Sequence, residues 1–174
     1  MTARSAERAG CPGWRGTPLL AFEHPNAPTC RAASRSDLSA IHALEVAEYG
    51  DASYPYFALR QLFELDGANW TVAEEAGEVC GYVLASLRAD RTAWLLAVAV
   101  AARCRSRGYG RALLETALAQ CRRAHVVLVR LTVDPANATA YRLYKEAGFV
   151  LERHEPDYFG PHEPRDVLVH RIYH

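Results

Sequence analysis

The stretch Arg103-Cys-Arg-Ser-Arg-Gly108-Tyr-Gly110-Arg111 joins two segments with very different hydrophobic patterns. Before it, Trp94 to Ala101 is continuously apolar, as in a central strand covered on both faces, and we expect it to be buried. After it comes a helix of about four turns with one apolar face, formed by Leu113, Leu114, Ala117, Leu118 and Cys121. Glycines and free amides therefore crowd at a helix N-terminus, where N–H groups and the helix dipole bind phosphate oxygens. The stretch predicts an anion site.

Two features of this stretch bear on which anion it binds. Gly108 and Gly110 let the backbone approach a ligand where a Cβ atom would collide. Four arginines add positive charge to a chain that is otherwise neutral, with 20 basic and 20 acidic residues, at positions Arg103, Arg105, Arg107 and Arg111. The same residues also suit a solvated basic turn in which glycine serves only the bend. The third glycine of a dinucleotide fingerprint is missing and no Gly-Lys-Ser/Thr follows, so neither a Rossmann nor a Walker site is indicated.

Length and composition place the chain among cytoplasmic single-domain proteins. Its 174 residues are 50% hydrophobic, which allows one core of useful size. The balanced charge provides no field for nucleic acid or an anionic membrane, and no apolar stretch reaches the ~20 residues that span a bilayer. Five cysteines without ligand spacing read as thiols in a reducing compartment. The seven histidines are scattered, and His170 with His174 shows helical spacing inside a predicted strand, so no metal site is expected.

The remaining segments predict an α/β (α+β) domain over residues 29–174, preceded by a tail over residues 1–28 that is partly disordered or docked as coil. An alternative is a short structured segment anchored by Trp14 and Phe22. Strands are expected near 29–33, 70–74, 79–87, 126–133, 149–153 and 166–173, and helices near 38–47, 55–66 and 138–147. Ser36-Asp37 should cap the first helix, Ala76-Gly77 should form a hairpin turn, and Gly148 should follow the last helix.

The last predicted helix carries a second group of polar residues, because Asn137, Tyr141 and Tyr144 recur at helical spacing. Asn137 can cap the helix or present its amide to a ligand. Tyr144 can pack as a core aromatic, the usual fate of a tyrosine in such a helix, or face a site.

Taken together, the motifs resemble the signature of the GCN5-related N-acetyltransferases (GNAT), and order and spacing agree from about residue 29 to the end. The residues that carry the resemblance are Val98-Ala-Val100, Arg105-Ser-Arg-Gly108-Tyr-Gly110-Arg-Ala-Leu-Leu114, Leu131-Thr-Val133, Asn137, Ala140, Leu143-Tyr144 and Gly148-Phe149, with Arg31-Ala-Ala-Ser-Arg-Ser-Asp-Leu38 at the start. The resemblance implies the GNAT fold, a central mixed, mostly antiparallel, splayed sheet of about six to seven strands flanked by about four helices.

The resemblance also implies transfer of an acetyl group from acetyl-CoA, without a metal, to a primary amine that attacks the thioester directly. It places the pyrophosphate of coenzyme A on Arg105, Ser106, Arg107, Gly108, Tyr109, Gly110 and Arg111, the pantetheine arm along Val98, Ala99 and Val100, and Asn137 beside the cofactor. Tyr144 is then the general acid, a phenol with a pKa of ~10 that protonates a departing thiolate of comparable basicity.

The general base departs from the family's familiar patterns. The two positions that carry a glutamate in well-known subfamilies are Trp94 and Thr132 here. A water relay to Glu45, Glu48, Asp134 or His154 could serve instead, although such residues are usually solvated surface groups. The base stays unassigned.

The acceptor side of the resemblance is less specific. Tyr158-Phe159-Gly160 resembles an aromatic stretch that walls the acceptor pocket, although Tyr158 equally suits packing at a bend. Tyr49, Tyr54 and Tyr56, with Glu45 and Glu48, fall where the acceptor end is usually shaped. The acceptor is a small amine, a lysine or a peptide N-terminus, and a homodimer is possible. The alternatives are a non-catalytic acyl-CoA sensor and transfer of another short acyl group.

Overall fold

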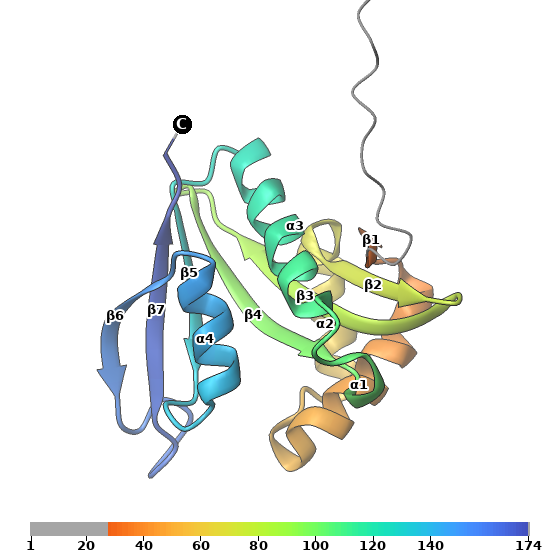
Figure 1. Ribbon diagram of the computed structural model, residues 1–174, viewed down its shortest axis with the longest axis horizontal. Coiled ribbons are helices and arrows are strands. Elements are labelled where there is room, and N and C mark those ends of the chain that lie inside the picture. Colours follow the sequence, from red (N-terminus) through yellow and green to blue (C-terminus); the bar gives the residue numbers. More distant parts are fainter. Residues whose placement is uncertain (1–27, 174) are drawn as a thin grey trace, which may run out of the picture.

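The protein, described here by a computed structural model over residues 28–173, is built on one mixed sheet with helices on both faces (Figure 1). The predicted tail lies outside the described residues except for Pro28. In chain order the strands and α-helices are β1 (Thr29–Ala32), α1 (Leu38–Tyr49), α2 (Tyr56–Asp66), β2 (Thr71–Glu75), β3 (Glu78–Leu87), β4 (Thr92–Val100), α3 (Tyr109–Arg123), β5 (Leu128–Val133), α4 (Ala138–Glu146), β6 (Val150–Glu155) and β7 (Arg165–Arg171).

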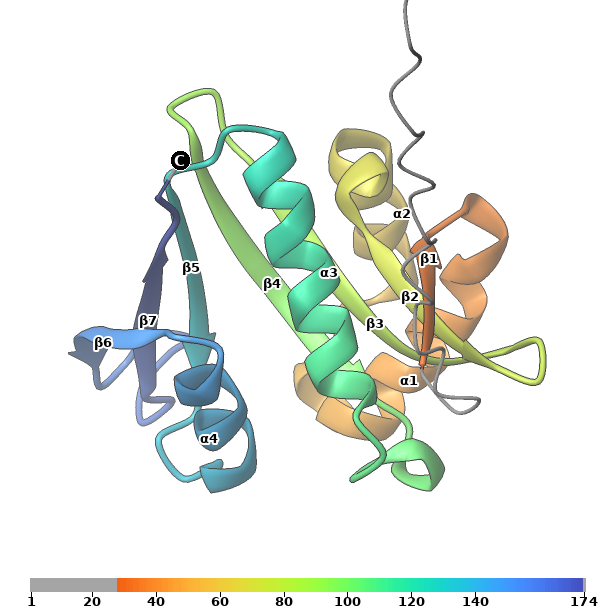
Figure 2. The same cartoon turned by 45° about the horizontal axis from the view of Figure 1, so that its top comes forward.

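The sheet has seven strands in the order β1-β2-β3-β4-β5-β7-β6, and every neighbouring pair is antiparallel except β4 with β5. Helices α3 and α4 cover one face, whereas α1 and α2 cover the other (Figures 1 and 2). Each face has its own apolar core, with Leu113, Leu118 and Phe149 in the first and Leu38, Leu59 and Trp70 in the second. The predicted fold is confirmed.

Glycines in left-handed conformations mark two of the predicted boundaries. The β2–β3 turn places Ala76 at φ 52° and Gly77 at φ 81°, the two positive values that a two-residue hairpin turn requires. Gly148, at φ 86°, follows α4 as predicted. These local signals therefore located the turns correctly.

The expected cap of α1 is wrong in detail, because capping begins one turn earlier. A 3₁₀ turn, Arg35–Asp37, precedes α1, and the Asp37 carboxylate accepts hydrogen bonds from the N–H and hydroxyl of Ser34 at 2.7 and 2.8 Å. The Arg31 guanidinium from β1 adds two more bonds, at 2.7 and 2.8 Å. Asp37 is only 7% exposed, and these donors, Arg31 first, hold the pKa of its carboxyl far below the usual range.

Asp37→Asn should therefore lower the free energy of unfolding by about 2 kcal/mol at neutral pH, because it weakens hydrogen bonds between charged groups. A depressed carboxyl pKa stabilises the folded state fully above the ordinary value of about 3.9, and this contribution is lost progressively as pH falls from there through the lower pKa of the folded state. Urea unfolding of both proteins at pH 7 and pH 3 checks this, since the difference in stability should shrink in acid. An equal difference at both values would contradict it.

Strand β4 is less buried than its apolar sequence indicated. Only Ala93, Leu95 and Ala99 are buried, whereas Trp94, Val98 and Val100 are partly exposed. The cause is a splay in the sheet, because the β4–β5 pairing ends at Leu95 opposite Leu131. The expectation of a strand covered on both faces is thus wrong for its second half.

A β-bulge explains where the splay begins. Leu84 on β3 pairs with Ala97 and Ala85 pairs with Leu95, so Leu96 is an extra residue in β4. A bulge bends its strand and increases the local twist. Figure 2 shows β4 and β5 meeting at one end and diverging toward the N-terminus of α3.

Candidate active site

The splay leaves one edge of β4 without a partner strand. The N–H of Ala101 donates to the carbonyl of Cys80 at 2.8 Å, so these residues form a hydrogen-bonded pair of the antiparallel β3–β4 ladder. Such pairs alternate, which directs the backbone groups of Ala99 toward Tyr82 on β3 and those of Val98 and Val100 away from β3. Of the three residues expected to pair with pantetheine, Val98 and Val100 therefore have backbone groups that no strand pairs with, and Ala99 does not.

Two side chains contact this open edge. The Tyr49 hydroxyl, at the end of α1, donates to the Val98 carbonyl at 3.1 Å. The Arg105 Nε donates to the Val100 carbonyl, also at 3.1 Å. Sequence reasoning had given Tyr49 no contact with β4, because no local pattern joins α1 to the middle of that strand.

The loop between β4 and α3 has the backbone of an anion site. Ser106 and Gly108 have φ values of 60° and 85°, and no atom of the described residues lies within 4 Å of a Cβ placed on Gly108. Gly108 is the N-cap of α3, so the N–H groups of the first turn have no intrahelical acceptor. Tyr109 contributes only backbone here, because its side chain is 6% exposed and packs in the core.

The sequence suggested that the arginines of the loop add unpaired positive charge, but the structure pairs each of them. Each is paired with a glutamate from a different element: Arg103 with Glu78 at 3.0 Å, Arg111 with Glu146 at 3.0 Å, Arg105 with Glu48, and Arg107 with Glu75. The four pairs nearly cancel the local charge. The attraction of the loop for anions therefore rests mainly on backbone N–H groups and the helix dipole.

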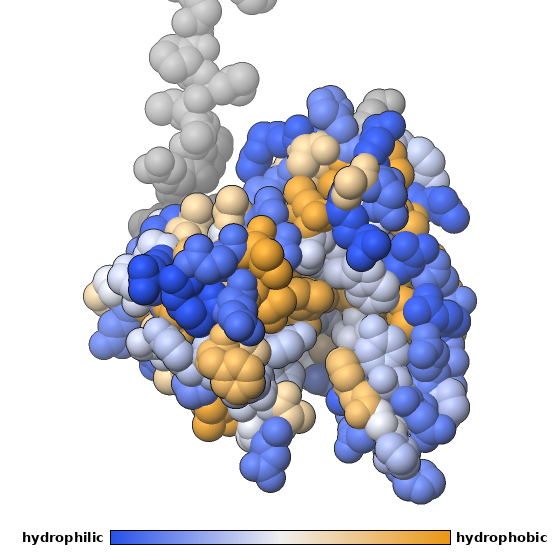
Figure 3. Space-filling model, turned by 180° about the vertical axis from the view of Figure 1, so that it is seen from behind, coloured by the Kyte–Doolittle hydropathy of each residue, from blue (hydrophilic) through white to orange (hydrophobic). Residues whose placement is uncertain are grey.

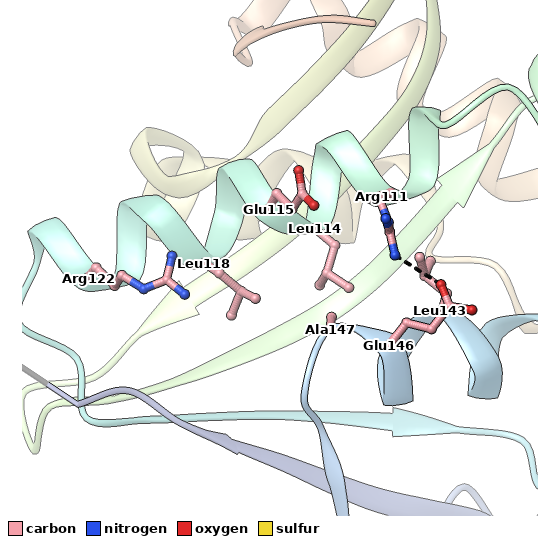
Figure 4. Close-up of a pocket in the computed structure, with 8 residues that line it drawn as sticks. All are labelled: Arg111, Leu114, Glu115, Leu118, Arg122, Leu143, Glu146 and Ala147. Atoms are coloured by element: carbon pink, nitrogen blue, oxygen red, sulfur yellow. Dashed lines mark hydrogen bonds and ion pairs between the residues drawn. The ribbon is translucent and has the colours of Figure 1, made fainter. Parts of the chain in front are cut away.

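A pocket of about 180 Å³ lies between α3 and α4, on the same face of the sheet as the loop's helix. Figure 4 shows the apolar side chains of Leu114, Leu118 and Leu143 pointing into it, with the Arg111–Glu146 ion pair at one end. The rest of the lining is Ala147 and four charged residues, Arg111, Glu115, Arg122 and Glu146, so the groove is only partly apolar.

Helix α4 presents its two predicted site residues differently. Asn137 caps the helix, since its side-chain oxygen accepts the N–H of Ala140 at 3.0 Å. That bond leaves the NH₂ group of the amide for other contacts. Tyr144 is 7% exposed and packs on Phe149, with ring centroids 6.0 Å apart. Tyr144 is therefore mostly buried in the core, as one of the two alternatives from the sequence predicted.

The hydroxyl of Tyr144 lies near the splay. Burial raises the pKa of Tyr144 to about 12, so the phenol keeps its proton at neutral pH. The pKa of Tyr49 is also raised, first by burial and next by the electrostatic effect of Tyr144. Helices α1 and α4, on opposite faces of the sheet, thus carry tyrosines that influence each other electrostatically.

Glu45 is not the solvated surface residue that its type suggested. It is 1% exposed, and its carboxylate accepts the hydroxyl of Tyr82 on β3 and the N–H of Tyr54 at 3.0 Å. Burial raises the pKa of the Glu45 carboxyl, against the opposing effect of these two hydrogen bonds. An acidic group is therefore held inside the protein beneath the acceptor end of the site.

Tyr158 acts electrostatically on Tyr54 although more than half of the chain separates them. The pKa of Tyr54 is raised by burial, then by the Glu45 carboxylate, then by Tyr158. The Tyr158 ring meets Phe159 edge to face, with centroids 4.8 Å apart. Seen from the α1–α2 face, the molecule has a hollow between its two halves, with hydrophobic residues along its middle (Figure 3).

The other proposed bases are engaged elsewhere. Glu48 pairs with Arg105, and the exposed Asp134 accepts the N–H of Ala136 at 2.8 Å. His154 lies on the edge strand β6, 53% exposed, with its Nδ1 2.7 Å from Asp166. Trp94 and Thr132, at the positions of the familiar glutamates, lie on β4 and β5.

The described residues contain neither a metal-binding cluster nor a membrane-spanning helix. Within residues 28–173, no group of three or more histidine, cysteine or acidic side chains could hold a metal ion. None of the helices in this same range is long and apolar enough to cross a membrane.

A sheet that splays beside a glycine loop at a helix N-terminus is the arrangement that the resemblance to the acetyltransferase family implied. The family model of the acetyltransferase (GNAT) family matches residues 36–149, and the chain belongs to this family. No curated protein matches the chain in sequence.

Solved structures agree with the fold. Ard1 from Thermoplasma volcanium superposes with a TM-score of 0.79 at 27% identity, covering 85% of this chain and 99% of Ard1. The ribosomal-protein-S18-alanine N-acetyltransferase from Escherichia coli gives 0.74 at 21% identity, covering 85% and 96%. A putative acetyltransferase, yncA, from Salmonella typhimurium gives 0.73 at 22% identity, covering 85% and 95%.

Proposed function

We propose that the domain over residues 29–174 transfers an acetyl group from acetyl-CoA to a primary amine, within a complex that holds both substrates. The observation that carries the proposal is the free edge of β4 at Val98 and Val100, which runs directly into the glycine loop. The pantetheine arm of acetyl-CoA is an extended amide chain that can pair with such an edge as an added strand. The pyrophosphate of acetyl-CoA then lies at the N-terminus of α3.

The residues fit this donor in shape as well as in chemistry. The space in front of Gly108 admits a phosphate against the backbone, and the groove between α3 and α4 lies next to it. The yncA structure was determined with its cofactor acetyl-CoA, which supports the same donor here. Acetyl-CoA supplies an activated acetyl group, and the protein supplies binding, orientation and proton transfer.

Tyr144 is the proton donor to the departing sulfur. A free thiol has a pKa of about 8.5, well below the value of about 12 for Tyr144, so the two groups are not of comparable basicity as first expected. Full transfer of the proton to a free thiolate would be unfavourable. Tyr144 therefore acts by donating a hydrogen bond to the sulfur while the C–S bond breaks.

The acceptor enters from the hollow on the α1–α2 face, opposite the groove between α3 and α4. We place Tyr54 and Tyr158 at its entrance, because Tyr158 acts electrostatically on Tyr54, and the faces of two tyrosine rings suit a single cationic amine. Glu48 is held by Arg105, so the free acidic lining expected from the sequence is reduced to the buried Glu45. A compact monoamine or a peptide N-terminus suits this site better than a polycation.

Release of coenzyme A from acetyl-CoA, measured over a panel of small amines, lysine and peptide N-termini, tests the proposal. At least one acceptor should accelerate release well above the rate of hydrolysis, and acetyl-CoA should be used in preference to succinyl-CoA or propionyl-CoA. Tight binding of acetyl-CoA without acceleration by any acceptor would favour a non-catalytic acyl-CoA sensor. A preference for another donor would indicate transfer of a different acyl group.

A further inference from the structure

Glu45 has an environment that a purely structural carboxylate seldom has. Within residues 28–173 no cation lies within ion-pair distance of it, although its side chain is almost wholly buried. An ionised carboxylate without a partner is costly to bury, and such groups concentrate at functional sites. Its two donors are the Tyr82 hydroxyl and the Tyr54 N–H, both at the acceptor end of the molecule.

The ammonium group of an acceptor must lose a proton before its nitrogen can attack a thioester. Of the four groups considered from the sequence, Glu48 is neutralised by Arg105, Asp134 holds a turn, and His154 is bound to Asp166 on the outer strand. Among these four residues only Glu45 is both buried and hydrogen-bonded to a tyrosine hydroxyl, that of Tyr82.

The titratable groups around Glu45 come from three elements and the α1–α2 connection. On α1, His42 lowers its pKa, and Tyr49 and Glu48 lie near its hydrogen-bonded partner Tyr82. Tyr82 faces it from β3 and Tyr54 from the connection before α2, while Tyr144 on α4 is linked to it through Tyr49. Arg105 lies beyond Glu48 and is paired with it. Apart from Arg105, whose charge Glu48 neutralises, these groups include no lysine or arginine. No cation among them would therefore keep the Glu45 carboxylate ionised at low pH.

We propose that Glu45 accepts the proton of the acceptor ammonium group, acting through water and the Tyr82 hydroxyl. The inference rests on the proposed acetyl transfer, whose general base it assigns. Tyr82 already donates its hydroxyl proton to Glu45. When that proton moves onto the carboxylate, the phenol oxygen takes one from a water molecule that has received the ammonium proton.

The step balances with one proton moved. The ammonium becomes a neutral amine with a free electron pair, and the Glu45 carboxylate becomes a neutral carboxylic acid. Tyr82 and the water each gain one proton and lose one. Glu45 returns its proton to solvent after the product leaves.

Glu45→Gln tests the assignment, because the amide keeps the size of the side chain and an oxygen for the Tyr54 N–H. With both substrates saturating, kcat should fall about 100-fold, in the range typical of a lost general base. The fall of kcat toward low pH, which the free carboxylate causes in the parent protein, should disappear. The dissociation constant of acetyl-CoA should change less than about twofold. Retention of the acidic fall in kcat would overturn the assignment while leaving acetyl transfer intact.

Glu152→Gln provides a matched control, since Glu152 on the edge strand β6 pairs with Arg130 on β5 and with Arg153, and with none of the groups of this network. It should leave both kcat and its pH dependence unchanged, and an equal effect of both substitutions would overturn the assignment.

A second measurement needs no variant and no acceptor. The side-chain carboxyl ¹³C shift of Glu45 in the intact protein should titrate with a midpoint above the ordinary glutamate value of about 4.3. An ordinary or lower midpoint would exclude Glu45 as the base whether or not an acceptor is found. A raised midpoint together with failure of every acceptor would instead contradict the proposed acetyl transfer.

Discussion

Gly108→Asp is expected to weaken acetyl-CoA binding at least about 100-fold, because a like charge placed against the pyrophosphate costs several kcal/mol. The space that a Cβ on Gly108 would enter contains no protein atom within 4 Å, so the new carboxylate would occupy the place proposed for phosphate. The backbone there, at φ 85°, also favours glycine. Titration calorimetry with acetyl-CoA measures the effect.

The strain of a non-glycine residue at this position needs its own control. Gly108 is the N-cap of α3 but has a left-handed conformation, not the extended one from which aspartate caps a helix. Gly77→Asp is the matched control, because Gly77 has nearly the same φ, 81°, and equally open surroundings, but lies in the β2–β3 turn. The control should keep its affinity within about threefold. Normal affinity in Gly108→Asp would refute the assignment of the loop.

Tyr144→Phe is expected to lower turnover roughly ten- to a thousandfold and to leave acetyl-CoA affinity nearly unchanged. The ring and its packing on Phe149 remain, so only the hydroxyl near the splay is lost. A proton donor that acts while the C–S bond breaks contributes to the transition state more than to binding of the ground state. Steady-state kinetics with calorimetry separates the two effects.

Tyr141→Phe controls for removal of a tyrosine hydroxyl from the same helix. The Tyr141 hydroxyl donates to Asp166 at 3.0 Å, away from the splay, so turnover should change little. Unchanged turnover in Tyr144→Phe would remove Tyr144 as the acid. A similar fall in both variants would point to a structural effect on α4.

The signals that succeeded were local ones. The apolar face of α3, the Ala76-Gly77 turn and Gly148 after α4 depend on residues within one or two turns of each other, where backbone sterics and periodicity decide the outcome. The loop from Arg105 to Arg111 has the left-handed glycine and the helix N-terminus that the sequence indicated, and its binding of an anion stays a prediction. Only its coupling to Asn137 and Tyr144 in the right order indicated coenzyme A.

The errors arose where a distant segment decides the environment. The sequence of Trp94 to Ala101 indicates a fully covered strand. In the structure, β5 pairs with β4 only as far as Leu95, where a bulge interrupts the pairing of β4 with β3. The sequence presents the four loop arginines as unpaired positive charge. In the fold each pairs with a glutamate from another element, namely β2, β3, α1 or α4. No pattern within a short window carries such information.

By itself, therefore, the sequence determined the order of the elements, the glycine loop at the start of α3 and membership of the acetyltransferase family, because these depend on neighbours in the chain. Only the tertiary structure decided that Glu45 is buried and hydrogen-bonded to Tyr82, 37 residues further along, and that Tyr158 acts electrostatically on Tyr54. Burial and hydrogen bonding depend on what the fold packs against a side chain. The proposal of acetyl-CoA as donor therefore rests on sequence motifs taken together, whereas the proposal of Glu45 as base rests on the packed sheet.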